Sequence, residues 1–174
     1  TNNIYYDNRE WGKFQPYIKE DLVKKHVASF NPDWVISLDA DEIFEERVTR
    51  AVLEELASKP HDIAYFFWCI EMWDKPGHHR PDYNFEDTRF YKFVPDKLDY
   101  YRQPVHCGMI PADLHRWATR SDYIFYHYGL MKKKDRVRKV ERYKQYDSKN
   151  IYLPKAWYEG LLQEGVAVKF DLNE

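Results

Sequence analysis

The chain has 174 residues, with 27 Lys and Arg, 29 Asp and Glu, and a formal net charge of −2. A hydrophobic fraction of 44% excludes a fully disordered chain, and the near-neutral balance excludes a nucleic-acid binder that works by bulk positive charge. No run of 18 uncharged apolar residues occurs, so no transmembrane helix is predicted, and residues 1–15 lack the pattern of a signal peptide. The length suits one domain, which we expect to span residues 1–174.

The spacing of apolar residues, interrupted by Pro and Gly, predicts helices and strands in alternation. This order indicates an α/β layered domain. In chain order we expect a helix at 17–30, a short buried strand at 34–38, a helix at 45–59, a buried strand at 62–73, a loop at 74–87, strands at 88–94 and 123–128, a basic helix at 132–147 and a helix at 154–164.

Three carboxylates crowd the end of the first predicted strand, at Asp39, Asp41 and Glu42. Alternation in an extended chain places Asp39 and Asp41 on the same side, where their repulsion is relieved by a cation between them. Mg²⁺ and Mn²⁺ prefer carboxylate oxygens, and substrate phosphates complete their coordination. The segment therefore suits a cation that holds a diphosphate. Capping of the following helix by the same acids is the alternative.

The segment "WVISLDADE", Trp34–Glu42, resembles the DxD segment of family 2 glycosyltransferases of the GT-A fold. "VHCG" at 105–108, "YHYG" at 126–129 and the basic stretch 132–143 resemble later segments of the same branch, so the resemblance covers about residues 17–160. It implies an α/β, Rossmann-like GT-A core with a mixed sheet flanked by helices. It also implies a metal-dependent enzyme that moves a sugar from a nucleotide-diphosphate-sugar donor to an acceptor hydroxyl, with inversion.

The resemblance implies that Asp39, Asp41 and His127 hold Mn²⁺ or Mg²⁺, with Asp41 the more direct ligand and Asp39 also near the donor ribose. An imidazole ligand favours Mn²⁺ slightly. Lys132 is expected to neutralise the leaving diphosphate, and His106 to bond the sugar or acceptor. The alternative interpretation is that His106 and His127 are hydrogen-bonded structural histidines and that Lys132 is a solvated surface lysine.

An inverting transferase needs a carboxylate that takes the proton of the acceptor hydroxyl. Asp87 is the first candidate and Glu86 the second, with Asp82 or Asp74 as alternatives. The sequence departs from the family pattern here, because the basic strand Arg89–Lys92 follows at once. Solvated loop acids are the other interpretation of this pair.

The GT-A fold begins with a βαβ nucleotide-binding half, whereas one helix and a short extended segment precede Trp34. We therefore expect an N-terminally truncated core that lacks about two βα units, at about 30 residues each. A non-catalytic carbohydrate- or protein-binding module on a degenerate GT-A scaffold is the second hypothesis. A metal-dependent phosphoesterase that uses Asp39, Asp41 and His127 is the third.

The expected partners are a nucleotide-sugar donor and a glycan, lipid-linked or protein acceptor, and no nucleic acid. We expect a cytoplasmic protein. Peripheral contact with a membrane is the alternative, because a basic helix is attracted to anionic lipids. Cys69 and Cys107 are expected to be buried thiols in a reducing compartment, with one disulfide as the alternative. Aromatic residues suit the walls of a sugar or acceptor groove; the candidates are Trp73, Tyr83, Tyr100, Tyr101 and Trp117.

Overall fold

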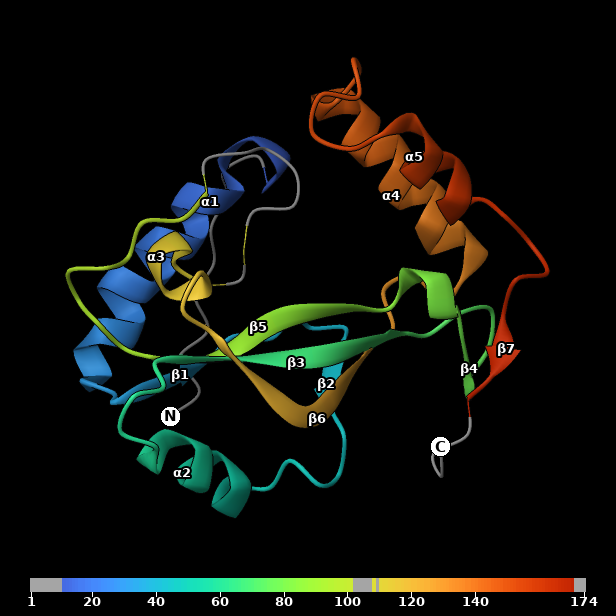
Figure 1. Ribbon diagram of the computed structural model, residues 1–174. Helices are drawn as coiled ribbons and strands as arrows, with labels where there is room; N and C mark the ends of the chain where they lie inside the picture. Colours follow the sequence, from blue (N-terminus) through green and yellow to red (C-terminus); the bar gives the residue numbers. More distant parts are fainter. Residues whose placement is uncertain (1–10, 102–107, 109, 171–174) are drawn as a thin grey trace.

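The computed structural model describes residues 11–101, 108 and 110–170 and shows a mixed β-sheet flanked by helices (Figure 1). The main sheet has the strand order β1-β5-β3-β6-β2, in which β3 and β6 are parallel and the other neighbours antiparallel. This confirms the predicted α/β class. The strands are β1 Trp34–Ile36, β2 Glu42–Phe44, β3 Ala64–Glu71, β5 Phe85–Lys92 and β6 Thr119–His127, and a second small sheet pairs β4 His78–His79 with β7 Val168–Lys169.

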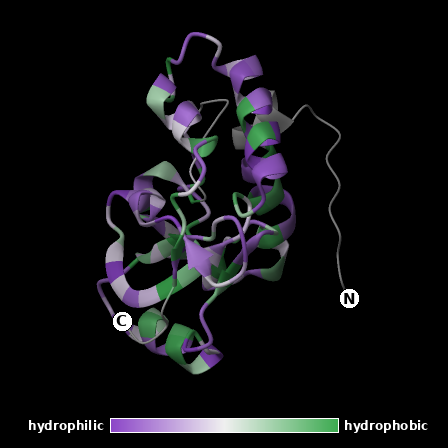
Figure 2. Cartoon of the chain, turned by 90° about the vertical axis from the view of Figure 1, so that its right-hand side faces the viewer, coloured by the Kyte–Doolittle hydropathy of each residue, from purple (hydrophilic) through white to green (hydrophobic). Residues whose placement is uncertain are grey.

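Helices cover both faces of the main sheet, and α2 lies on the opposite side from α1 and α3 (Figure 1). Hydrophilic and hydrophobic residues alternate along the helices, as in elements with one buried face (Figure 2). Within the described residues, no helix has both the length and the apolar character that crossing a bilayer requires. The helices are α1 Trp11–Leu22, its continuations η1 Val23–Val27 and η2 Ala28–Phe30, then α2 Arg50–Ser58, η3 Pro81–Tyr83, α3 Ala112–His115, α4 Lys133–Tyr146 and α5 Lys155–Leu161.

Strand β3 is apolar along nearly its whole length because both of its faces are covered. Tyr65 and Phe67 pack with Leu56 of α2, whereas Ala64, on the other face, packs with Leu114 of α3. A separate cluster fastens the α4–α5 hairpin to the end of the sheet. Its buried members are Trp73, Leu130, Val140, Tyr143, Tyr158 and Leu161.

Strands β1, β3 and β6 run in the same direction, and β2 and β5 run against them. The last residues of β1, β3 and β6 therefore gather at one edge of the sheet, together with the first residues of β2 and β5. The register makes this concrete, since His127 at the end of β6 pairs with Glu71 on one side and Glu42 on the other. We call this edge the carboxyl edge.

Two predictions for the segment around the acidic turn were wrong. The strand at 34–38 is not buried, because β1 lies at the outside of the sheet, has β5 as its one partner among the described strands, and leaves Ile36 44% exposed. The helix expected at 45–59 begins only at Arg50, where Thr49 accepts the N–H of Val52. Residues 45–49 form a turn instead, in which the Val48 N–H donates to the Glu45 carbonyl at 3.0 Å, and they follow β2, which pairs with the end of β6.

The loop expected at 74–87 contains β4 and η3 and ends where β5 begins, at Phe85. The remaining predicted helices and strands are confirmed, with ends shifted by a few residues. The largest shift is at the first helix, which starts at Trp11 rather than at residue 17.

Candidate functional site

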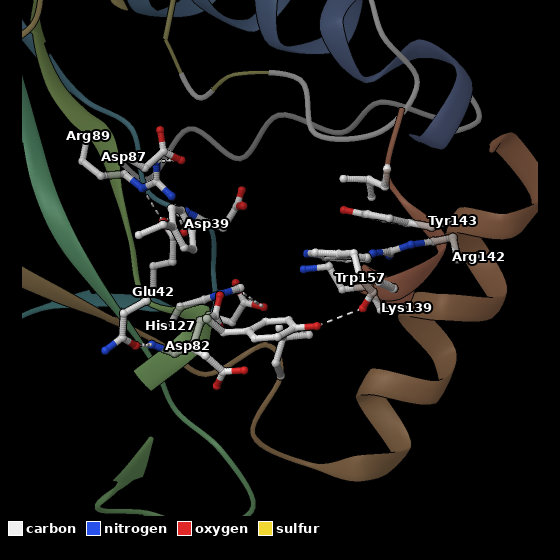
Figure 3. Close-up of a pocket in the computed structure, with 18 of the residues that line it drawn as sticks. Asp39, Glu42, Asp82, Asp87, Arg89, His127, Lys139, Arg142, Tyr143 and Trp157 are labelled. Carbon is white, nitrogen blue, oxygen red and sulfur yellow. Dashed lines mark hydrogen bonds and ion pairs between the residues drawn. The ribbon is translucent and has the colours of Figure 1, made fainter. Parts of the chain in front are cut away.

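A pocket of about 830 Å³ opens at the carboxyl edge, between the sheet and the α4–α5 hairpin. Figure 3 shows acidic side chains on the sheet side facing basic and aromatic side chains of the hairpin. The acids are Asp39, Asp41, Glu42, Glu71, Asp82 and Asp87. The hairpin contributes Lys139, Arg142, Tyr143, Leu153, Ala156 and Trp157.

The acidic segment forms a tight turn rather than the extended chain that the sequence argument assumed. The Glu42 N–H donates to the Asp39 carbonyl at 3.0 Å, and the Asp39 N–H donates to Glu42 Oε2 at 3.0 Å. Strict alternation therefore does not explain how Asp39 and Asp41 come together. The turn nevertheless brings both to the same pocket, as predicted.

His127 lies between two carboxylates that come from different parts of the chain. Its Nδ1 is 2.6 Å from Glu71 Oε1, and its Nε2 is 3.6 Å from Asp41 Oδ2. Burial disfavours a charge on the ring, but the two carboxylates outweigh it and raise the pKa of His127 to about 9. The approach of His127 in turn lowers the pKa of Asp41. The pair predicted to bind metal is thus assembled, and its imidazole is charged at neutral pH in the absence of a cation.

Gly129 lies directly against this pair. A Cβ at position 129 would be 2.3 Å from Asp41 Oδ2 and 2.7 Å from His127 Nε2, closer than real Cβ contacts allow. The "HYG" spacing therefore keeps a space in front of the two donor atoms. A carboxylate oxygen and an imidazole nitrogen facing one space suit Mn²⁺ or Mg²⁺.

Asp39 adds a further carboxylate to the sheet side of the pocket. Its side chain lines the pocket, is exposed, and takes part in none of the hydrogen bonds or ion pairs of the described residues. An unpaired carboxylate in the same pocket as Asp41 and His127 is available to a ligand. Asp41 and His127 thus face each other as a pair of possible cation ligands, whereas Asp39 shares their pocket without forming a close donor cluster with them.

Asp87, the first candidate for the base, lines the pocket but is engaged. Its Oδ2 is 2.7 Å from Arg89 Nη1, and its Oδ1 accepts the N–H of Thr88 at 2.7 Å. Arg89 is almost fully buried and also donates twice to Glu42, at 2.8 and 2.6 Å. Arg89 belongs to the basic strand that departs from the family pattern, and it holds Glu42 and Asp87 in place by ion pairs.

The other candidate bases are also paired with arginines. Glu86 follows the alternation of β5 away from the pocket and lies 2.8 Å from Arg120, so it is not in a position to act there. Asp82 lines the pocket and accepts two hydrogen bonds from Arg80, both at 2.9 Å. Asp74 is not a lining residue; its Oδ1 is 2.9 Å from Arg136.

The basic helix contributes different residues from the one predicted. Lys132 is exposed at the N-cap of α4 and does not line the pocket. Lys139 and Arg142, two turns further along, line it instead, because that face of α4 turns toward the carboxyl edge. His106 and Cys107 lie outside the described residues.

Of the five candidate aromatic residues, Tyr83 lines the pocket; the others are buried elsewhere or exposed away from it. Sequence reasoning missed Trp157, whose ring stacks on that of Tyr143 with centroids 5.9 Å apart and planes inclined by 10°. It also missed Glu71. The available signal was that Glu71 is the one charged residue in the apolar run of β3.

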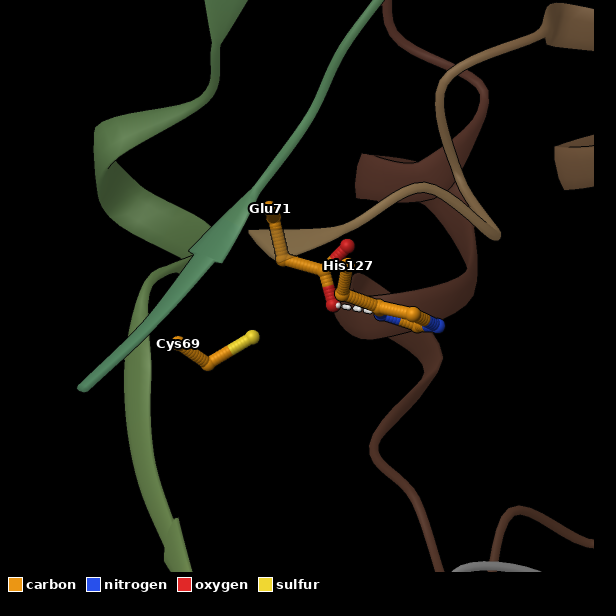
Figure 4. Close-up of side chains that lie close together, drawn as sticks. All are labelled: Cys69, Glu71 and His127. Atoms are coloured by element: carbon orange, nitrogen blue, oxygen red, sulfur yellow. Dashed lines mark hydrogen bonds and ion pairs between the residues drawn. The ribbon is translucent and has the colours of Figure 1, made fainter. Parts of the chain in front are cut away.

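A second group of possible metal ligands lies behind His127. Atoms of Cys69, Glu71 and His127 lie within 4.8 Å of one another, and all three residues are buried (Figure 4). However, the Glu71–His127 hydrogen bond already occupies Nδ1, and burial raises the pKa of the Cys69 thiol. Nε2, in contrast, faces Asp41 and the pocket. The geometry favours Glu71 as the residue that orients His127 from behind.

No protein-family model, no curated protein and no solved structure matches the chain. The inference of function therefore rests on the chemistry of the pocket and on the residues that line it.

Proposed function

We propose that the chain is a metal-dependent glycosyltransferase with a GT-A core, which moves a sugar from a nucleotide-diphosphate donor to an acceptor hydroxyl with inversion. The observation that carries the proposal is the two-sided pocket, with acids on one wall and cationic and aromatic side chains on the other (Figure 3). A nucleotide diphosphate with a cation carries groups that match both walls. The resemblance of Trp34–Glu42 to the DxD segment supports the same substrate class.

In this proposal Asp39, Asp41 and His127 hold the cation, and Glu71 keeps Nε2 of His127 directed toward it. A divalent cation there, when bound, would neutralise the diphosphate as the glycosidic bond breaks. Lys139 and Arg142 bind phosphate oxygens from the opposite wall. The second wall also offers the Tyr143–Trp157 stack, which suits a planar base or the apolar face of a sugar.

Asp87 is the proposed base, because Glu86 points out of the pocket. Each carboxylate oxygen has two lone pairs, and Arg89 and the Thr88 N–H together use one on each oxygen of Asp87. Asp87 thus keeps acceptor capacity for the proton of an acceptor hydroxyl. Arg89, which stays charged, compensates Glu42 beside it.

Titration calorimetry with UDP and GDP, with and without Mn²⁺, tests the binding step. We expect at least one nucleotide to bind at least about tenfold more tightly with Mn²⁺, because the cation bridges diphosphate and carboxylates. Asp41→Asn should remove this gain. Asp96→Asn, a matched change at an exposed acid outside the pocket, should retain it. Cation-dependent binding that survives Asp41→Asn would refute the metal assignment.

A non-catalytic module remains the second candidate, and one observation favours it. All four candidate bases, Asp74, Asp82, Glu86 and Asp87, are paired with arginines, as in a site that binds without proton transfer. Turnover separates the two: an enzyme releases nucleoside diphosphate from a sugar donor when acceptor is added. A module binds free glycan without cation and releases none.

A further inference from the structure

The loop at 148–154, which joins α4 to α5, is held in shape by one buried carboxylate. Asp147, 2% exposed, accepts the backbone N–H groups of Ile151, Tyr152 and Leu153 at 2.6, 3.1 and 3.0 Å. It also accepts the hydroxyl of Tyr158 at 2.8 Å. These bonds fix the loop without using the side chains of Ile151 and Tyr152. The loop lies at the end of the hairpin far from the sheet (Figure 1).

The fixed loop presents two apolar side chains to solvent. Ile151 is 72% exposed and Tyr152 is 44% exposed, although each could be buried at a gain in free energy. The next residue, Leu153, turns inward and lines the pocket. The exposed pair is thus a rigid apolar tip next to the pocket wall.

The hairpin that carries the tip is rich in basic residues. Between Lys132 and Lys155 the sequence has ten Lys and Arg and three acidic residues, whereas the whole chain has a net charge of −2. The remainder of the chain is therefore strongly acidic. Lys134, Lys144 and Lys149 are exposed and form none of the ion pairs found among the described residues.

We infer that this tip and two exposed lysines near it in the chain, Lys144 and Lys149, form a docking surface for an anionic lipid membrane. Ile151 and Tyr152 enter the headgroup region, where an aliphatic side chain and an amphipathic ring are both accommodated. Lys144 and Lys149 contact anionic headgroups. The acidic remainder of the chain is repelled from the same surface, which fixes the orientation of the molecule.

An acidic protein is a weaker match to this surface. Specific protein interfaces bury about 800 Å² per partner, with an apolar centre, whereas two neighbouring side chains offer far less. An interfacial anchor, by contrast, requires only a few apolar side chains supported by basic residues. The inference does not depend on the proposed enzymatic activity.

Vesicle co-sedimentation of the whole chain tests it, with vesicles of phosphatidylcholine alone and with added phosphatidylserine. We expect binding to the anionic vesicles only, weakened by high salt. Ile151→Ser combined with Tyr152→Ser should weaken it at least about tenfold, and Lys144→Glu combined with Lys149→Glu by a similar factor. Thermal unfolding of each variant establishes that it is folded.

Two matched controls make the result specific. Trp117→Ser removes an equally exposed apolar side chain elsewhere, and Lys59→Glu with Lys97→Glu makes the same change in net charge outside the hairpin. Both should bind vesicles like the wild type. The inference is overturned if the wild type stays with the supernatant. It is also overturned if the serine variant binds unchanged, or if the control charge reversal weakens binding as much as the hairpin reversal.

Discussion

At the residue scale, the site depends on His127, which connects two carboxylates through its two ring nitrogens. Glu71 forms a hydrogen bond with Nδ1 on the buried side of the ring, and Asp41 faces Nε2 from the pocket. A histidine held in this way keeps one nitrogen directed at a ligand, so its orientation is set before anything binds. Gly129 preserves the space in front of it.

Replacing Gly129 tests this arrangement without removing any donor atom. Gly129→Ala places a methyl group 2.3 Å from Asp41 Oδ2 and 2.7 Å from His127 Nε2, so both side chains must move. We expect Mn²⁺ affinity to fall about 10- to 100-fold, the usual cost of displacing the groups that support a metal site. Equilibrium dialysis with Mn²⁺ measures the change.

Gly108→Ala is the matched control, since the nearest atom to its Cβ would be 3.4 Å away. Its Mn²⁺ affinity should equal that of the wild type. If Gly129→Ala binds Mn²⁺ normally, the Asp41–His127 pair is not the site of the cation.

Several residues of the site could be identified from the sequence, and others could not. Asp39, Asp41, Asp87 and His127 belong to short local patterns, and all four line one pocket. Glu71 and His127 are 56 residues apart in the chain and are brought together by the pairing of β3 with β6. No local pattern records that register.

At the element scale, the α4–α5 hairpin provides the second wall of the pocket and depends on Asp147. Burial alone raises the pKa of this carboxyl, but bonds from Tyr152 N–H, the Tyr158 hydroxyl and Leu153 N–H outweigh it, so the pKa falls below the usual 3.8. The charged carboxylate therefore contributes its full stabilisation of the fold at pH values above 3.8, the usual pKa of the carboxyl. The contribution is lost as the pH falls through the lowered value.

Asp147→Asn should thus lower the free energy of unfolding at neutral pH by about 1–3 kcal/mol. The amide is neutral, and only one of its two terminal atoms can accept hydrogen bonds, so it cannot accept all four. The substitution should also flatten the loss of stability as the pH falls below the usual carboxyl pKa of 3.8. Chemical denaturation across this pH range measures both effects. An unchanged pH profile, with Asp96→Asn as the reference, would show that Asp147 does not anchor the hairpin.

Most elements were predictable, and β3 most clearly, since its apolar run is long and bounded by turns. The strand β2 was not, because Glu42–Phe44 has too few residues to show a period and is stabilised by pairing with β6. The conformation of β2 is therefore set by its pairing with β6 and not by its own sequence pattern. The same pairing explains why the helix after it starts late.

At the scale of the whole molecule, the strand directions explain why acids from distant segments share one pocket. Three strands end, and two begin, at the carboxyl edge, and the basic hairpin faces it. The α/β class followed from the order of predicted elements. The opposition of an acidic and a cationic wall did not, because it depends on how α4 packs against the sheet.

Electron paramagnetic resonance of Mn²⁺ tests the central claim most directly, because it measures how much cation is bound and the variants then assign that cation to a site. We predict that the wild type binds Mn²⁺ and binds it more tightly with a nucleoside diphosphate, that Asp41→Asn loses this binding, and that Cys69→Ser retains it. Mn²⁺ binding that is absent from the wild type, or that survives Asp41→Asn and is lost in Cys69→Ser, would contradict the account.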